Sequence, residues 1–386
     1  MLTTGINFTN FKLKKKYPNL KRSLKLLLSE KNPIIQSLTN EYRNNFNIKK
    51  IKKYKKFLNY RIIGMGGSVL GAQAIYEFLK PNIKKNFIFV NNLQDKKKKV
   101  KENKFVNIIV SKSGNTIETI INANIHIKKN DQNIFITENN KNHLHLIAEN
   151  LKSEIVHHNN FIGGRYSVLS EVGMLPAELM GLNINKFKQL NNLIKNKSFL
   201  NSLISNVSSL IYFHKKKKFN SIIINYDEKS VSLFNWYQQL VAESLGKKKK
   251  GLLPIISIMP RDNHSVMQLY LDGFQNNFFT LFYVNNNYSL RVNNNQTISS
   301  PNFLKNKNIN EIMLAQKKAT ENVFKKKNIP FRSIMIKKRN ENTLGELFCY
   351  FILETILVAK VLNLNPYDQP SVELIKNETR RLLILN

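Results

Sequence analysis

The sequence has little cysteine, few acidic residues and no long apolar run. Its single cysteine, Cys349, cannot form a disulfide within the chain, and the surrounding run LFCYFILE predicts a buried side chain in a reducing compartment. No stretch of about 18 consecutive apolar residues is present, so we predict no membrane-spanning helix. The first residues, MLTTGINFTNFKLKKK, lack the apolar segment of a signal peptide. We therefore expect a cytoplasmic protein.

The shortage of acid leaves a strongly basic chain. Lys and Arg number 61 against 25 Asp and Glu, which gives a formal net charge of +36. Such a charge usually suggests nucleic acid or an anionic membrane as partner. The lysines, however, form scattered runs such as DKKKKVK, HKKKKF and GKKKKG, without interleaved aromatic residues or a nucleic-acid-binding motif. We interpret them as solvated surface and predict no specific nucleic-acid partner and no membrane partner.

What the chain does contain is a regular alternation of strands and helices. The runs YRIIG, NFIFV, FVNIIV and QNIFIT alternate with helical stretches, and a second cycle uses NSIIIN, LPIISIM and NNFFTLFYV. This alternation predicts the α/β class, with two mainly parallel sheets, each flanked by helices. We place an N-terminal helical segment at 1–48, a first α/β domain at 49–190, a second at 191–340 and a C-terminal helical segment at 341–386.

A glycine-rich loop, IIGMGGSVLGAQA, joins a predicted strand to a predicted helix. The N–H groups of a helix N-terminus bind anions, so the loop suggests a dinucleotide or a phosphate. A dinucleotide fingerprint would put its third glycine at Val69, and the next strand ends in Asn where an acidic ribose ligand belongs. These departures weaken the dinucleotide interpretation, and a tight turn without a ligand remains an alternative.

A second loop, IVSKSGNTIETI, gathers hydroxyl groups at a strand-to-helix junction. Its hydroxyl residues are Ser111, Ser113, Thr116 and Thr119, around Gly114. A helix N-cap needs one such hydroxyl, whereas a phosphate can accept hydrogen bonds from several. The two loops together therefore predict a site for a phosphorylated small molecule.

Two further residues stand in suggestive places. Arg165 follows two glycines in FIGGRYS, where the backbone can approach a ligand closely, although a surface turn has the same pattern. His264 stands at the predicted start of a helix in NHSVMQLYLDG, and a lone histidine is usually structural or solvated. The histidines show no metal-site spacing with acidic partners, so we predict no metal site.

Glu243 is the most informative carboxylate. On the predicted helix LFNWYQQLVAESLG it follows Trp236 and Leu240 at i+7 and i+3, so it lies along an apolar line of that helix. This position predicts a partly buried carboxylate and not a solvated one. The four lysines that follow it are interpreted as a solvated loop.

Six segments in this order resemble the glucose-6-phosphate isomerase family. They span residues 64 to 376 and read GMGGSVLG, SKSGNTIET, GGRYSVLSEVG, QQLVAESLGKKKKGLLP, HSVMQLYLDG and DQPSVELIK. The resemblance implies two sugar-isomerase (SIS) type domains with the active site in a cleft between them. It also implies a homodimer with shared active sites and no cofactor.

The resemblance further implies roles for single residues. Glu243 would be the isomerisation base and Arg165 would stabilise the enediolate. His264 and Lys376 would open the sugar ring, with the histidine reaching into the neighbouring subunit's site. The substrate would be bound by Gly67, Ser68, Ser111, Lys112, Ser113, Thr116, Thr119 and Gln369.

The implied activity is interconversion of glucose 6-phosphate and fructose 6-phosphate through a cis-enediol intermediate, as in glycolysis and gluconeogenesis. Two alternatives stay open. An isomerase of wider range would also accept mannose 6-phosphate. A non-catalytic sugar-phosphate-binding regulator would use the same domains, but it should lack Glu243, Arg165 or His264, which this chain has.

Overall fold

The computed structural model describes residues 5–13, 17, 19–93, 104–128, 131–285, 289–292 and 301–385. Its first half is built on a five-stranded sheet of order β3-β2-β4-β5-β6. All neighbouring strands in it are parallel, as predicted. The strands are β2 (Asn59–Gly64), β3 (Asn86–Val90), β4 (Phe105–Val110), β5 (Gln132–Thr137) and β6 (Glu154–His157).

The second half holds another five-stranded sheet, of order β1-β10-β9-β7-β8. Its strands are β1 (Ile6–Thr9), β7 (Asn220–Asn225), β8 (Leu253–Ile258), β9 (Asn277–Val284) and β10 (Phe331–Ile336). The strands β7 to β10 are parallel to their neighbours, while β1 runs antiparallel to β10. The two sheets confirm the predicted α/β class.

The strand β1 corrects one expectation. The segment 1–48 was predicted to be helical, yet its first described residues form a strand of the second sheet. Without β1, the outer edge of β10 would expose unpaired N–H and C=O groups, and pairing satisfies them. The four residues of β1 are too few to show a strand period in the sequence. The domain boundaries themselves stay a prediction.

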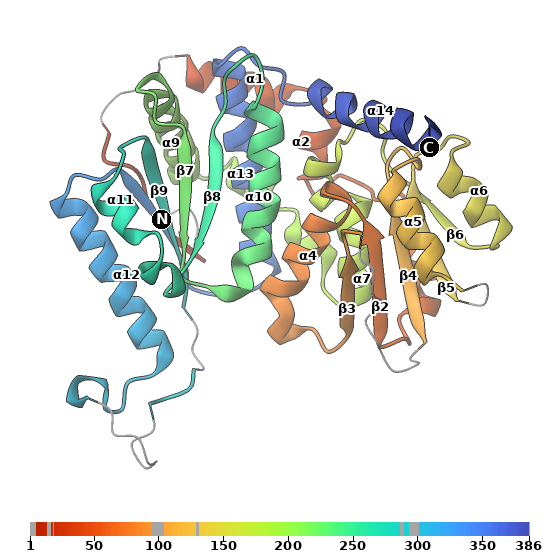
Figure 1. The fold of residues 1–386 in the computed structure, drawn as a ribbon, viewed down its shortest axis with the longest axis horizontal. Coiled ribbons are helices and arrows are strands. Elements are labelled where there is room, and N and C mark those ends of the chain that lie inside the picture. The colour runs from red at the N-terminus through yellow and green to blue at the C-terminus, as the bar shows by residue number, and fades with distance from the viewer. Residues whose placement is uncertain are drawn as a thin grey trace.

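Helices flank both sheets (Figure 1). The longest, α13, is buried along nearly its whole length and includes the buried Cys349, as predicted for that side chain. None of the helices in the described ranges is long and apolar enough to span a membrane. The helices are α1 (Leu20–Ser29), α2 (Pro33–Ser37), α3 (Ile48–Ile51), α4 (Gly67–Leu79), α5 (Ile117–His126), α6 (His143–Asn150), α7 (Glu171–Met180), α8 (Leu190–Leu193), α9 (Lys197–Lys215), α10 (Val231–Leu245), α11 (Met267–Asp272), α12 (Ile309–Lys326), α13 (Glu341–Val361) and α14 (Pro370–Leu385).

The two halves meet along α4 and α10, which lie side by side in the middle of the molecule (Figure 1). Near one end, Ser232 at the start of α10 donates to Glu77 Oε2 at the end of α4, at 2.5 Å. At the other end, Gly66 before α4 lies against Gln239 on α10. The two helices are therefore antiparallel. This packing puts the glycine-rich loop beside the last turns of α10.

The first sheet also places both predicted anion loops together. The chain leaves β2 toward β3 on one side and leaves β4 toward β5 on the other, so β2 and β4 flank a topological switch point. Gly64 and Val110 pair at the carboxyl ends of these two strands. Ligands of open parallel sheets bind at such a point. The loops after β2 and β4 both begin there.

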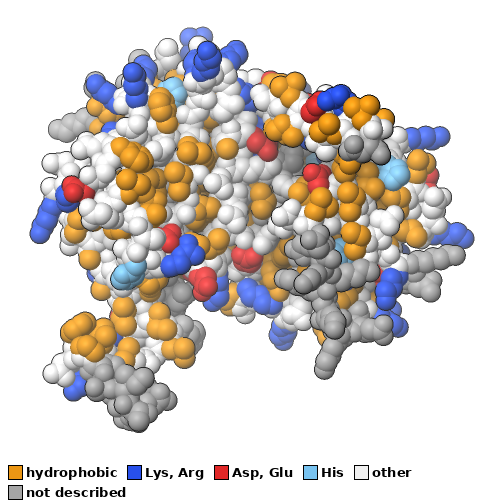
Figure 2. Space-filling view, viewed as in Figure 1, with side chains coloured by type: hydrophobic (Ala, Val, Ile, Leu, Met, Phe, Trp, Pro, Cys, Tyr) orange, Lys and Arg blue, Asp and Glu red, His pale blue; other side chains and the backbone are white. Residues whose placement is uncertain are grey.

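The last helix, α14, is the least packed element of the described chain. Figure 1 shows it in dark blue, leaving the middle of the molecule and running over the half that holds the first sheet. None of its residues is buried. Hydrophobic side chains gather at the same place in the surface view (Figure 2), and Leu374, Ile375 and Leu383 are each more than three-fifths exposed.

Candidate active site

Two glycine motifs are in direct backbone contact at the start of α4. A Cβ atom on Gly67 would lie 2.1 Å from the carbonyl carbon of Gly164, so only glycine fits there. Gly66 has a φ of +51°, a left-handed conformation that glycine adopts without strain. The glycines of the first loop thus allow the segment Gly164–Leu169, a 3-10 helix, to approach α4 closely. This contact brings Arg165 to the glycine-rich loop. Ser68 follows Gly67 in the first turn of α4.

The second loop is tightly wound. The Ser111 and Thr116 hydroxyls are 2.9 Å apart, and Gly114 turns the chain between them with a φ of +66°. Ser113 is exposed, and its Oγ accepts a hydrogen bond from the Asn115 amide at 3.3 Å. Thr119 is fully buried one turn into α5, and its Oγ1 has no hydrogen-bond partner among the described residues. Of the four hydroxyl groups predicted to bind a phosphate, only those of Ser111 and Thr116 therefore lie within hydrogen-bond distance of each other.

Lys112 lies in the same loop and supplies its positive charge. Its Nζ is 3.4 Å from Glu138 Oε1, and its side chain is about one-third exposed. An exposed ion pair of this kind contributes little to stability and exchanges partners readily. Lys112 can therefore turn to an anion bound between the two loops.

Glu243 is held on both oxygens in the last turn of α10. Arg165 Nη1 donates to its Oε2 at 3.0 Å, and Gln239 Nε2 donates to its Oε1 at 2.9 Å. The Glu243 side chain is 28% exposed, so the expectation of a partly buried carboxylate is confirmed. Gln239 was missed in the sequence, although its i−4 spacing from Glu243 on one helix face was a usable signal.

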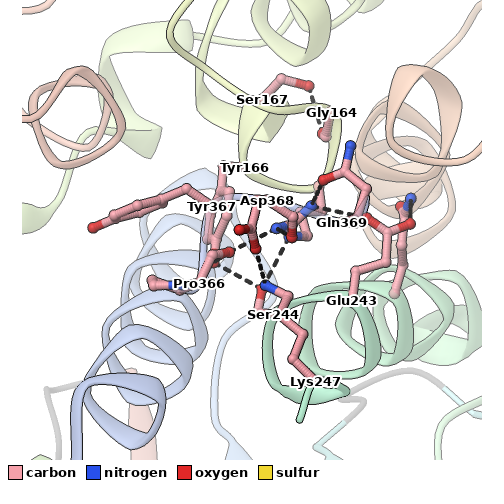
Figure 3. A network of polar contacts seen from close by, with 12 residues as sticks. Gly164, Tyr166, Ser167, Glu243, Ser244, Lys247, Pro366, Tyr367, Asp368 and Gln369 are labelled. Carbon is pink, nitrogen blue, oxygen red and sulfur yellow. Dashed lines mark hydrogen bonds and ion pairs between the residues drawn. The ribbon is translucent and has the colours of Figure 1, made fainter. Parts of the chain in front are cut away.

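The Arg165 guanidinium is buried, and all five of its N–H groups have acceptors (Figure 3). Such complete pairing is what allows a charge to lie inside a protein. The acceptors are Ser244 Oγ at 3.0 Å from Nε, Glu243 Oε2 at 3.0 Å and Gln369 Oε1 at 2.6 Å from Nη1, and Pro366 O at 2.6 Å and Asp368 O at 3.1 Å from Nη2. The structure thus brings the Gln369 side chain to the guanidinium nitrogen that also donates to Glu243.

The lysine run after Glu243 is only partly solvated, which corrects the interpretation of a free loop. Lys247 forms an ion pair with Asp368 Oδ1 at 2.9 Å and also donates to the Asn365 carbonyl, while Lys250 donates to the Leu362 carbonyl at 2.9 Å. Hydrogen bonding to Lys247 lowers the pKa of Asp368. Leu362 caps the C-terminus of α13, where carbonyl groups lack partners within the helix, so its carbonyl attracts the Lys250 cation.

Two predicted residues are not joined to this centre. His264 is exposed at the end of the 3-10 helix Arg261–His264 and not at the start of α11. Lys376 lies on α14 and pairs with Glu373 at 2.7 Å. In the described part of the chain, no hydrogen bond or ion pair connects either residue with Arg165 or Glu243. Within one chain, therefore, the geometry assembles the carboxylate–guanidinium pair and the two loops only.

Comparisons with known proteins identify the family of the chain. A family model described as Phosphoglucose isomerase matches residues 34–253. The chain is 33% identical to a glucose-6-phosphate isomerase of Methanocaldococcus jannaschii, with 87% of each chain covered. It is 31% identical to a glucose-6-phosphate isomerase of Campylobacter jejuni, with 86% of each covered.

Solved structures show the same fold. A hypothetical protein of Thermus thermophilus aligns with a TM-score of 0.82 at 20% identity, covering 95% of this chain and 94% of that one. A glucose-6-phosphate isomerase of Chlamydia trachomatis aligns with a TM-score of 0.76 at 16% identity, covering 99% of this chain and 89% of that one. Since a family match covers more than half of the sequence, and a relative with one-third identical residues covers most of it, this chain belongs to the phosphoglucose isomerase family.

Proposed function

We propose that the protein is an aldose–ketose isomerase that interconverts glucose 6-phosphate and fructose 6-phosphate. The observation that carries this proposal is the pair formed by the Glu243 carboxylate and the buried Arg165 guanidinium, 3.0 Å apart, with the guanidinium residue against the glycine-rich loop. Membership of the family and the names of its curated relatives support the same reaction.

The proposed chemistry moves one proton from C2 to C1 of an open-chain sugar phosphate. Glu243 takes the proton from one carbon and returns it to the other, and negative charge develops on the sugar oxygen in between. A fixed cation aimed at that oxygen stabilises the transition state more than the substrate. Arg165 supplies the cation without moving, since its side chain is held by five acceptors. Side chains alone suffice for these steps, so we propose neither a metal nor a cofactor.

We propose that the substrate phosphate lies between the loops at the switch point of the first sheet. The start of α4, with Gly67 and Ser68, offers helix N-terminal amides. The paired hydroxyls of Ser111 and Thr116 face the same edge, and Lys112 adds charge. Ser113 and Thr119 belong to the same proposed set, and Gln369 would contact the sugar beside Arg165.

Ring opening requires a second acid–base pair, and we propose His264 and Lys376 for it. Both are exposed and stand apart from Glu243 in one chain, which fits a site completed by a second copy and by movement of α14. We accordingly propose a homodimer in the cytoplasm, with α/β domains at 49–190 and 191–340, a helical C-terminal segment at 341–386 and an N-terminal segment at 1–48 that adds β1 to the second sheet.

The deciding experiment replaces the base. Glu243→Gln keeps size and polarity but removes basicity, so kcat for fructose 6-phosphate should fall by about 10²-fold or more while substrate binding is largely retained. A coupled assay gives kcat, and the dissociation constant of a five-carbon sugar-acid phosphate, a mimic of the enediolate, reports binding.

The matched control is Glu149→Gln, which removes the same charge from an exposed side chain on α6 and should leave turnover unchanged. A Glu243→Gln enzyme with wild-type kcat would rule out the proposed base. Mannose 6-phosphate, tested as a separate substrate, distinguishes a narrow isomerase from one of wider range.

A further inference from the structure

Two buried hydroxyls lie behind Arg165, on the side away from Glu243. Ser244 follows Glu243 on α10, and Tyr166 follows Arg165 in the 3-10 helix Gly164–Leu169. Both side chains are fully buried. The Tyr166 OH is 2.8 Å from Ser244 Oγ and 3.0 Å from the Pro366 carbonyl oxygen. Figure 3 shows Tyr166 and Ser244 close to Pro366.

The donors and acceptors fix the direction of every hydrogen bond in this group. The Arg165 Nε–H can only donate, so Ser244 Oγ accepts at 3.0 Å. The Pro366 carbonyl can only accept, so the single Tyr166 proton goes to it. The Ser244 proton is then left for the Tyr166 oxygen. Burial raises the pKa of Tyr166, which keeps that hydroxyl protonated as this order requires.

The chain of hydrogen bonds closes on itself. It runs from Arg165 Nε to Ser244, from Ser244 to Tyr166 and from Tyr166 to the Pro366 carbonyl, which also accepts from Arg165 Nη2 at 2.6 Å. The carbonyl has two lone pairs and satisfies both donors. Two of the three guanidinium nitrogens, Nε and Nη2, thereby belong to one closed ring of hydrogen bonds. The guanidinium cannot rotate about its Nε–Cζ bond without breaking hydrogen bonds of this ring.

This ring determines which nitrogen of the guanidinium lies outside it, and a sugar oxygen would take the place of one of the two side-chain acceptors of that nitrogen. Only Nη1 faces Glu243 and Gln369. Trp236 Nε1 holds the other end of the residue by donating to the Arg165 carbonyl at 3.1 Å. A side chain with several rotatable bonds is thus fixed at both ends, and preorganised charge of this kind is what stabilises a developing oxyanion.

We propose that Ser244 and Tyr166 are positioning residues that fix the plane of the Arg165 guanidinium and so direct Nη1 at the reacting oxygen. The proposal rests on the proposed isomerase function for its kinetic consequence. Both hydroxyl groups belong to fully buried side chains, so we expect neither to touch the substrate. Their removal should therefore weaken stabilisation of the transition state and leave binding of the ground state largely intact.

The kinetic test compares Ser244→Ala and Tyr166→Phe with the wild type. Each variant should lower kcat by about 10-fold with KM within about twofold, because a misplaced catalytic group acts on the transition state. Affinity for the five-carbon sugar-acid phosphate should fall by about as much as kcat. The double variant should be little worse than either single one, since each breaks the same ring. Ser244→Thr keeps the hydroxyl and should retain most of kcat.

The matched control is Ser208→Ala, another fully buried serine, whose hydroxyl donates to the Ile204 carbonyl at 2.9 Å in α9. It should leave kcat unchanged, so a general effect of removing a buried hydroxyl is separated from loss of position. If Ser244→Ala fails to fold, the Tyr166→Phe variant tests the proposal instead. This substitution removes the hydroxyl and keeps the aromatic side chain that packs in the core. Folded variants with wild-type kcat, or a change confined to KM, would overturn the proposal.

A second measurement does not depend on activity. In protein labelled with ¹⁵N at arginine side chains, rotation about the Arg165 Nε–Cζ bond should be slow in the wild type and faster in Ser244→Ala. A wild type that turns over no sugar phosphate but shows this difference would refute the isomerase function and support the positioning role. Equal rotation rates would refute the positioning role alone.

Discussion

At the scale of single residues, Lys188 is the most unusual charge in the described chain. It is buried, and its Nζ donates to the Ser37 carbonyl at 2.6 Å and to the Leu169 carbonyl. It also lies over the Tyr42 ring, 4.8 Å from the centroid. No carboxylate in the described residues lies within ion-pair distance of it. Burial lowers the pKa of Lys188 to about 7.

This lysine makes stability depend on pH. Below pH 7 it is charged in both folded and unfolded chains, and the folded state bears the full cost of burying the charge. Between pH 7 and 10.5 only the unfolded chain binds the proton, so stability rises with pH. Lys188→Met should therefore stabilise the protein more at pH 6 than at pH 9, with a difference of about 3 kcal/mol.

Urea unfolding of both proteins at both pH values measures this difference. The control is Lys197→Met, which removes an exposed lysine at the start of α9 and should change stability equally at the two pH values. An equal effect of Lys188→Met at pH 6 and pH 9 would show that the buried amine keeps its proton throughout.

At the scale of elements, the linker between α13 and α14 is the best-held irregular segment near the site. Arg165 donates to Pro366 and Asp368, and Lys247 pairs with Asp368 at 2.9 Å. The helix that follows has no buried residue, and an isolated helix of its length is marginal in water. The direction in which α14 leaves the molecule therefore depends on how its first residues are held.

Loss of the Lys247 contact should loosen this linker. Lys247→Met should speed amide hydrogen exchange in residues 365–385 and lower kcat/KM by about two- to fivefold, the range of a partly exposed ion pair. Lys249→Met changes an exposed neighbour in the same run and should alter neither quantity. Exchange as slow in Lys247→Met as in the wild type would mean that the other contacts, such as those of Arg165 and Tyr166 with Pro366, are enough to hold the linker.

The elements also show what a sequence can reveal. Seven of the ten strands in the described residues and the partial burial of Glu243 followed from local patterns of period two or 3.6, and the two loops followed from their glycine and hydroxyl residues. The strands β1, β6 and β10 were not predicted. The contacts of Arg165 with Pro366 and Gln369 join residues about 200 positions apart, and no local pattern encodes them. The same limit applies to Lys247, whose acceptors lie beyond the far end of α13. A local sequence pattern can indicate which side chains are candidates for a site. Which other side chains they contact depends on tertiary packing, which a local pattern does not encode.

At the scale of the whole molecule, the residues proposed for the two steps of the reaction lie in two separate places on one chain. One place holds the residues for proton transfer, and the other holds the histidine for ring opening. Glu243 and Arg165 are assembled in the middle, while His264 is exposed on the second half. A second copy would bring one histidine to each carboxylate if the dimer is isologous. The arrangement can be tested by mixing chains with complementary defects.

Glu243→Gln and His264→Ala chains should each be nearly inactive alone. Unfolded and refolded together in equal amounts, they should recover about a quarter of wild-type activity, because half of the dimers are hybrids and each hybrid has one intact site. Activity is measured after mass spectrometry has verified hybrids. Hybrids that form but stay inactive would show that His264 serves its own chain or no site at all.

The pairing of β1 with β10 has a consequence for how the protein is made. The strand β1 is synthesised before every other described strand, but its partner is at residues 331–336, roughly 300 residues later in the chain. At roughly 5–20 residues per second, β1 waits on the order of tens of seconds before β10 leaves the ribosome. The second sheet therefore cannot be completed during synthesis of its first strands, and a nascent chain truncated before β10 has an open edge where chaperones, or other nascent chains, can bind.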